Sequence, residues 1–272
     1  MVWFSRDGTC VASAPCTCDR TDIHCSGLQL RAMPTFIPRD VSNESEAGVP
    51  MLVAFFMMYS NNIEVIDDRA FCNLTFALSS RVFMMLASNA ISSLADNAFD
   101  CIQNNVHYLD LKNNRLTALP VAMLKLTNLT RLFLQNNPLV RLNPLVMKQL
   151  GPTLRNLQLD LGRFSTWPSE FSHLRVLSVL EANNITFPYI PEDGFSGFSS
   201  SLTHLHFHNS RLTSMPQSFC RISLLRLAKV EVLEPIDLKN ILLCVRKVQN
   251  TVNESNGLLK YIIETRNSTK SN

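Results

Sequence analysis

The sequence lacks long apolar runs, a strong excess of either charge and the common catalytic motifs. No stretch approaches the roughly 20 consecutive apolar residues of a membrane-spanning helix. The net charge is only +3 over 272 residues, which gives no reason to expect nucleic acid as a partner. No P-loop, GxSxG, HExxH or GxGxxG motif occurs. We therefore expect a protein that is not an enzyme and that uses no cofactor.

The first residues, MVWFSRDGTC, also lack a basic patch followed by the long apolar core of a secretion signal. We expect any signal peptide or membrane tether to lie outside the sequence given. Hydrophobic residues make up 46% of the chain, so it can build a sizeable core.

Eight cysteines are present, and half of them crowd the N-terminal region. Their spacing there, C-x5-C-x-C-x6-C, lacks the CxxC pairs of common zinc sites, so it favours disulfides over zinc. Disulfides in turn predict an oxidising compartment. The four N-terminal cysteines are Cys10, Cys16, Cys18 and Cys25, and the others are Cys72, Cys101, Cys220 and Cys244.

A repeat runs through the middle of the chain. The segments VHYLDLKNNRL (106–116), LTRLFLQNNPL (129–139) and LTHLHFHNSRL (202–212) share the pattern L-x-x-L-x-L-x-x-N-x-L, with Ser210 at the asparagine position of the third. Less exact copies lie at 53–63, 81–91, 154–164 and 222–232, and one of uncertain register lies at 173–185. A tandem period of about 20 to 28 residues is typical of leucine-rich repeats.

This period predicts an α/β repeat fold, a curved leucine-rich-repeat solenoid with a parallel concave β-sheet. Each unit supplies one short strand and a return segment, and stacking buries the leucines in a continuous core. We expect the asparagine at position 9 to satisfy backbone groups of adjacent turns. The predicted organisation is a cysteine-rich N-terminal cap and insert (1–50), seven to eight repeats (51–232), and a C-terminal cap and polar tail (233–272).

The segment CTCDRTDIHCSGLQLRAMPTFIP (16–38) resembles the cysteine-rich N-terminal flank of extracellular leucine-rich-repeat proteins. That resemblance implies an extracellular protein with the pairs Cys10–Cys18 and Cys16–Cys25. The central repeats, such as LPVAMLKLTNLTRLFLQNNPL (119–139), resemble the ectodomains of leucine-rich-repeat receptor-like kinases and their secreted relatives. Two features depart from the family pattern: a polar insert at Arg39–Pro50, and the absence of the usual four-cysteine C-terminal flank.

The remaining cysteines have predicted partners. Cys72 and Cys101 follow equivalent apolar anchors in neighbouring repeats, about one sheet spacing of roughly 5 Å apart, which is within disulfide reach. The alternative is two buried free thiols. We also expect the pair Cys220–Cys244.

Positions 3, 5 and 7 of each repeat should point out of the sheet and form the binding surface. Its N-terminal half is rich in aromatic residues and methionine, which interfaces favour. The alternatives are that the insert Arg39–Pro50 covers this patch or that the register is wrong by one residue. The candidate residues are Phe55, Met57, Tyr59, Phe83, Met85, Tyr108, Asp110, Arg131, Phe133, His204, His206 and His208.

A solvent-facing position predicts a small effect on stability. Tyr108→Ala and Phe133→Ala should change the free energy of unfolding by no more than about 0.5 kcal/mol. Leu109→Ala and Leu132→Ala, one residue away but facing inward, should each cost about 2–5 kcal/mol.

Three of the six histidines, His204, His206 and His208, alternate along one predicted strand and therefore share a face. They could bind a metal ion, form a pH-sensitive contact surface or serve as ordinary polar contacts. The neighbouring repeats offer no cysteine or obvious glutamate at the same level, and Asp160 is two repeats away. We therefore favour polar contacts and expect no metal site.

Six N-x-[ST] sequons are compatible with secretion and with a glycoprotein. None places its asparagine at position 3, 5 or 7, so glycans would leave the predicted concave face open. The six asparagines are Asn43, Asn73, Asn128, Asn184, Asn253 and Asn267.

Together these features predict an extracellular recognition module that binds a protein or peptide ligand on its concave face. The favoured form is the ligand-binding ectodomain of a receptor. The alternative is a free secreted binder, such as an enzyme inhibitor or a matrix protein.

Overall fold

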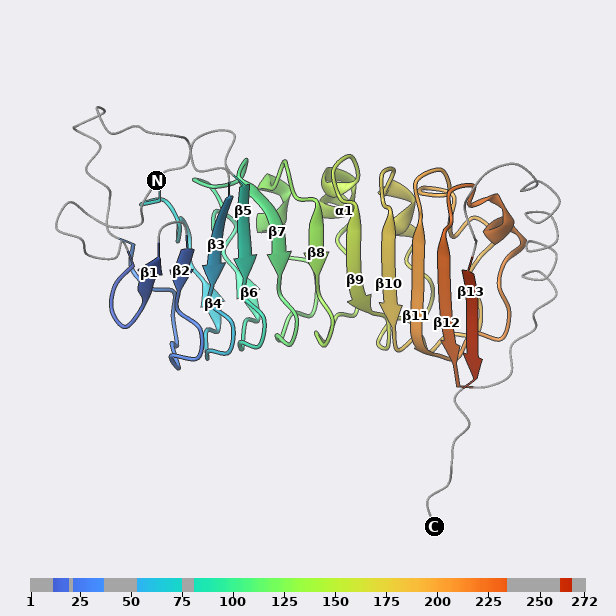
Figure 1. The fold of residues 1–272 in the computed structure, drawn as a ribbon, viewed down its shortest axis with the longest axis horizontal. Helices are drawn as coiled ribbons and strands as arrows, with labels where there is room; N and C mark the ends of the chain where they lie inside the picture. Colours follow the sequence, from blue (N-terminus) through green and yellow to red (C-terminus); the bar gives the residue numbers. More distant parts are fainter. Residues whose placement is uncertain (1–11, 20–21, 37–52, 75–80, 234–259, 266–272) are drawn as a thin grey trace, which may run out of the picture. The chain divides into compact units, whose positions relative to one another are not determined.

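The computed structural model describes residues 12–19, 22–36, 53–74, 81–233 and 260–265, and the predicted insert Arg39–Pro50 lies outside them. The chain divides into two compact units, Met1–Pro138 and Leu139–Asn272, and each is described by itself. In both units each repeat contributes a short strand to a largely parallel sheet (Figure 1). Within the described residues, no helix combines the length and the apolar character needed to cross a membrane.

The first unit begins with an antiparallel pair and continues as a parallel sheet. The strand β2 joins the antiparallel partner β1 to the parallel strands β3, β5, β7 and β8. On the return side, β4 and β6 form a small parallel sheet of their own. The elements are β1 (Thr17–Asp19), β2 (Asp22–His24), β3 (Val53–Met57), β4 (Val65–Ile66), β5 (Arg81–Met85), β6 (Ser93–Leu94), β7 (Val106–Asp110), the 3₁₀ helix η2 (Val121–Lys125) and β8 (Arg131–Phe133).

The second unit repeats the scheme with five parallel strands, β9 to β13. Among the described residues of this unit, the α-helix α1 starts at Pro144, where the side chain of Asn143 accepts hydrogen bonds from two backbone amides of the first turn. The elements are α1 (Pro144–Leu150), β9 (Asn156–Asp160), η3 (Ser169–His173), β10 (Val179–Asn183), β11 (His204–Ser210), η4 (Gln217–Arg221), β12 (Leu227–Val232) and β13 (Lys260–Thr265). The last strand lies within the segment that the sequence assigned to the polar tail.

The inward positions of the repeat build the core, as predicted. Leu109, Leu111, Leu132 and Leu134 have no exposed surface. The return segments add aromatic anchors, also as predicted. These anchors include Phe71 and Phe99, whose rings stack with centroids 6.0 Å apart.

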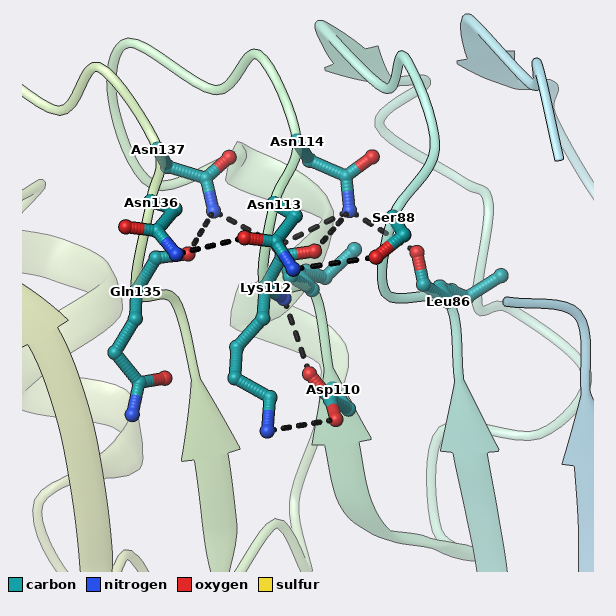
Figure 2. A network of polar contacts seen from close by, with 10 residues as sticks. Leu86, Ser88, Asp110, Lys112, Asn113, Asn114, Gln135, Asn136 and Asn137 are labelled. Carbon is teal, nitrogen blue, oxygen red and sulfur yellow. Dashed lines mark hydrogen bonds and ion pairs between the residues drawn. The ribbon is translucent and has the colours of Figure 1, made fainter. Parts of the chain in front are cut away.

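The asparagine at position 9 links neighbouring repeats through the backbone, which confirms its predicted role in the first unit. The Nδ2 of Asn114 donates to the carbonyls of Leu86 and Leu111, each at 3.0 Å, while its Oδ1 accepts from the amide of Ile91 at 2.9 Å. Asn137 makes the corresponding set of bonds one repeat later (Figure 2). Because both side chains are buried, each amide satisfies backbone groups that water cannot reach.

The residue directly before each asparagine at position 9 adopts a left-handed conformation that lets the chain turn. Asn113 and Asn136 have φ values of 54° and 56°, which asparagine tolerates better than most residues. Their side chains also form a chain: Asn136 donates to Asn113 at 2.7 Å, and Asn113 donates to the hydroxyl of Ser88 at 3.2 Å (Figure 2). The turns of the first unit are thus joined by side-chain as well as backbone hydrogen bonds.

In the second unit other residues stand at the asparagine position, and in two of its repeats the structure settles or corrects the register expected from the sequence. The copy of uncertain register begins at Leu177, and the buried Ile185 fills its asparagine position. The last copy begins at Leu225 rather than at Ile222, because Ala228 pairs with Leu205 of the preceding strand. The predicted frame for 222–232 is therefore wrong by three residues. The outward residues of these two repeats are Val179, Glu181, Asn183, Leu227, Lys229 and Glu231.

Two of the predicted disulfides are confirmed. Cys16 bonds Cys25 with their Cα atoms 4.6 Å apart, and Cys72 bonds Cys101 with their Cα atoms 4.8 Å apart. The free-thiol alternative for Cys72 and Cys101 is therefore wrong.

Two further cysteines, Cys18 and Cys220, are also disulfide-bonded. Their predicted partners, Cys10 and Cys244, lie outside the described residues.

Candidate functional site

An aromatic ladder runs across the outward face of the first unit. It consists of Phe55 on β3, Phe83 on β5, Tyr108 on β7 and Phe133 on β8. Successive ring centroids lie 5.1, 5.5 and 4.9 Å apart. Aromatic pairs at such distances add about 0.5–1.5 kcal/mol each beyond their area of burial. The structure therefore brings together four candidate residues that lie up to 78 positions apart in sequence.

The rings of the ladder shield one another, so the face is less exposed than the sequence suggests. Phe55, Phe83 and Tyr108 are half-buried. Phe133 is only 8% exposed, because the Tyr108 ring packs on it and the ammonium of Lys112 lies 5.4 Å from its ring centroid. The prediction that Phe133 faces open solvent is therefore wrong, although its place on the outward face is right.

Other candidates surround the ladder. Met57 and Met85 are half-buried one alternation along β3 and β5, while Arg131 at the start of β8 is exposed. Tyr59 follows β3 and is 43% exposed, which makes it one of the large exposed side chains of the described residues. The face thus combines rigid rings with an adaptable and partly charged margin.

Asp110 is a support for this face more than a part of its open surface. It is only 7% exposed, and its carboxylate accepts from the backbone amide of Lys112 at 3.0 Å and pairs with the ammonium of that residue at 3.5 Å. The expectation that Asp110 is open to a ligand is therefore wrong, since the turn after β7 covers it. Burial, reinforced by the nearby Asp110 carboxylate and opposed by Arg131, raises the pKa of Tyr108 above 10.0.

The three histidines of β11 share the outward face of the second unit, as predicted, and all are half-buried. His204 is held by a 2.9 Å contact between its Nδ1 and the hydroxyl of Thr203. The rings of His206 and His208 are nearly perpendicular, with centroids 6.2 Å apart. The Nε2 of His206 is buried, and no described residue forms a hydrogen bond with it.

Acidic residues of the neighbouring strands flank this row. Glu181 on β10 pairs in register with His206. On β12, Glu231 contacts the Nδ1 of His208 at 3.1 Å and the ammonium of Lys229 at 2.6 Å. The sequence interpretation missed Glu181 and Glu231, because both lie in the two repeats whose register was unresolved or wrong.

The electrostatics of the row follow from these neighbours. Burial lowers the pKa of His206 below 6.5; Glu181 opposes this shift, and the neighbouring His208, His204 and Lys229 reinforce it. The imidazole of His206 is therefore neutral at neutral pH. Hydrogen bonds, first from Lys229 and then from His208, lower the pKa of Glu231.

The sequon asparagines of the described residues lie away from the outward strand positions. Asn73 and Asn128 are exposed, and the side chain of each donates a 2.7 Å hydrogen bond to a backbone carbonyl. Asn184 is half-buried and accepts from Asn209 at 2.6 Å. The other three, Asn43, Asn253 and Asn267, lie outside the described residues.

Sequence comparison matches a family model described as leucine rich repeat to residues 83–139. This span covers the β5, β7 and β8 repeats, which hold three of the four ladder rings. No curated protein matches the chain in sequence.

Comparison of the fold identifies two similar solved structures. One is a chain of the octameric complex of Latrophilin 3, Unc5D and FLRT2 (LRR), with a TM-score of 0.50, 17% identity, and coverage of 92% of this chain and 91% of that one. The other is human 5T4 (Wnt-activated inhibitory factor 1, trophoblast glycoprotein), with a TM-score of 0.52, 17% identity, and coverage of 93% and 80%. Together with the repeat geometry, these likenesses show that the chain has a leucine-rich-repeat fold, with a family match over residues 83–139 and an N-terminal Cys16–Cys25 disulfide.

Proposed function

We propose that the protein is an extracellular, non-enzymatic recognition module that binds a protein or peptide through the aromatic ladder and its margin. The observation that carries this proposal is the ladder itself: four aromatic rings in successive contact on the outward face of a sheet, with no covering element among the described residues. Soluble proteins seldom leave a contiguous apolar patch open unless a partner uses it.

The ladder is suited to binding because it is already ordered. Each ring is packed against the next, and the strands that carry the rings are hydrogen-bonded in register. Side chains that are immobile before association lose little entropy when a partner binds. Stacked aromatic rings at the centre with Tyr59 and Arg131 at the margin match the usual arrangement of an apolar interface core and a polar rim.

The likeness to other proteins supports a protein partner. The similar structure that contains FLRT2 (LRR) is an assembly with Latrophilin 3 and Unc5D, so a module of this fold takes part in protein complexes. The disulfides Cys16–Cys25 and Cys72–Cys101 support an oxidising, extracellular location. The favoured form is a receptor ectodomain, with a free secreted binder as the alternative. A membrane span downstream in the full transcript would favour the receptor, and a stop codon would favour the secreted form.

Affinity capture from an extracellular protein fraction tests the proposal, with the glycosylated chain as bait. The wild type is compared with Tyr59→Ala and Phe83→Ala, which remove an exposed and a half-buried ring of this face. Tyr189→Ala is a matched control, since Tyr189 is 63% exposed but lies outside the strands. We expect captured proteins to be lost in the two face variants and retained in the control, with all variants folded by circular dichroism. Equal capture by every variant would place the binding surface elsewhere.

A further inference from the structure

The outward face of β11 holds a cluster of potential metal ligands outside the aromatic ladder. Glu181, His206 and His208 each present one ligand atom, and the three atoms lie within 4.8 Å of one another. Two imidazoles and one carboxylate are an established protein ligand set for zinc that leaves a coordination position open. We propose that Glu181, His206 and His208 form a Zn²⁺ site on the second unit.

The sequence predicted no metal site, because the neighbouring repeats offered no obvious glutamate at the level of the histidines. The structure removes that argument, because the register of β10 places Glu181 directly beside His206. It also shows which two of the three histidines can bind one metal ion together. His204 is held by Thr203, so the chelating pair is His206 and His208.

The nitrogen atoms of both histidines are suited to this role. The Nε2 of His206 is buried and has no hydrogen-bond partner among the residues that the structure describes, so a metal ion would satisfy an atom that is otherwise desolvated at a cost. The Nδ1 of His208 contacts the carboxylate of Glu231 at 3.1 Å. A carboxylate on one ring nitrogen orients the imidazole and leaves the other nitrogen, Nε2, to bind metal.

The local charge and spacing are also compatible with a cation. The carboxylates of Glu181 and Glu231 flank the row on both sides, and the ammonium of Lys229 pairs with Glu231 at 2.6 Å. Tetrahedral zinc with ligands at about 2.0–2.2 Å holds them roughly 3.3–3.6 Å apart. Side-chain rotations that move the ligand atoms by about 1 Å would therefore bring all three into place without moving the strands.

The test uses the glycosylated chain without a histidine tag and Zn²⁺ alone as the probe. At free zinc near 100 times the dissociation constant, the melting temperature should rise by about 5–10 °C. Mg²⁺, which prefers oxygen ligands, should leave it unchanged. Absence of a zinc-dependent shift, or an equal shift with Mg²⁺, would overturn the proposal.

Calorimetric titration of variants then assigns the ligands. Glu181→Gln, His206→Gln and His208→Gln should each weaken zinc binding by about tenfold or more, and Glu231→Gln by about 10–100-fold through the orientation of His208. His204→Gln is the matched control on the same strand and should bind as the wild type does. If His206→Gln fails to fold, Glu181→Gln decides, since its amide keeps the shape of the side chain. Wild-type affinity in Glu181→Gln would overturn the assignment.

Discussion

Replacing Phe133 by alanine measures how much the aromatic ladder contributes to stability. Phe133 is 8% exposed, so truncation removes most of the transfer free energy of a buried phenylalanine, about 1.5–3 kcal/mol. It also removes one ring pair with Tyr108, worth about 0.5–1.5 kcal/mol. No large cavity term is added, because the vacated space opens onto the outward face. We therefore expect a loss of about 2–4 kcal/mol, well above the value of about 0.5 kcal/mol for a solvent-facing residue.

The assay is urea unfolding followed by circular dichroism, with the midpoint and the slope m compared between variants. Tyr59→Ala is the control, since Tyr59 follows β3 on the same side of the unit and is 43% exposed; its loss should stay within about 1 kcal/mol. Leu132→Ala, with no exposed surface, should cost about 2–5 kcal/mol. If Phe133→Ala matches Tyr59→Ala instead of Leu132→Ala, the ring is not packed as described.

The asparagine ladder, the inter-repeat disulfide and the ionisation of Tyr108 give further tests. Asn114→Ala should lower the free energy of unfolding by about 2–4 kcal/mol in the same urea assay, because it leaves several buried backbone groups without a hydrogen-bond partner. The control Asn113→Gly, at an exposed position, should cost less than half as much. The double variant Cys72→Ala/Cys101→Ala opens a loop of sequence separation 29 and should lose about 2–4 kcal/mol; an unchanged midpoint would contradict this. Because burial raises the pKa of Tyr108 above 10.0, the folded state stays protonated where the unfolded state ionises, so stability should fall as pH rises above about 10. Tyr108→Phe should reduce that fall and remove the raised titration of Tyr108 from an ultraviolet titration.

The fold could be predicted from the sequence because the same pattern of buried and hydrogen-bonding residues recurs many times along the chain. Leucine at positions 4 and 6 and asparagine at position 9 each have a single physical reason, burial in one case and backbone satisfaction in the other. Where both features are present, as around Leu109 and Asn114, the predicted register agrees with the structure. The Cys72–Cys101 disulfide followed from the same repeat geometry, since neighbouring repeats bring these two residues to equivalent places, whereas the Cys16–Cys25 pair followed from the family resemblance.

The predicted register failed in two of the repeats that lack the asparagine at position 9. In the copy at 173–185, Ile185 occupies position 9, so no asparagine marks the register. In the last repeat, Leu225 and Leu227 fit positions 4 and 6 of the predicted frame, but the strand buries Ala228 and Val230 at these positions. Small and β-branched residues fill these inward positions as well as leucine does, so hydrophobicity alone cannot choose the frame. The candidate site was therefore predicted incompletely, because Glu181 and Glu231 lie in those two repeats.

Exposure was the second quantity that the pattern could not supply. Alternation along a strand decides which face a side chain takes, but its accessibility depends on the neighbours in adjacent strands. Phe133 and Asp110 occupy outward positions and are nonetheless nearly buried, one under Tyr108 and Lys112 and the other under the turn that follows β7.

The shielding within the ladder has a consequence for recognition. A partner that meets these rings contacts only part of each one, since neighbouring rings already cover the rest. The binding energy that remains available must then come from the half-buried Phe55, Phe83 and Tyr108 and from the more exposed Tyr59 and Arg131. Phe133 would act through Tyr108, by fixing the position of its ring. A substitution at Phe133 should therefore reduce stability and binding together, whereas Tyr59→Ala should reduce binding with little change in stability.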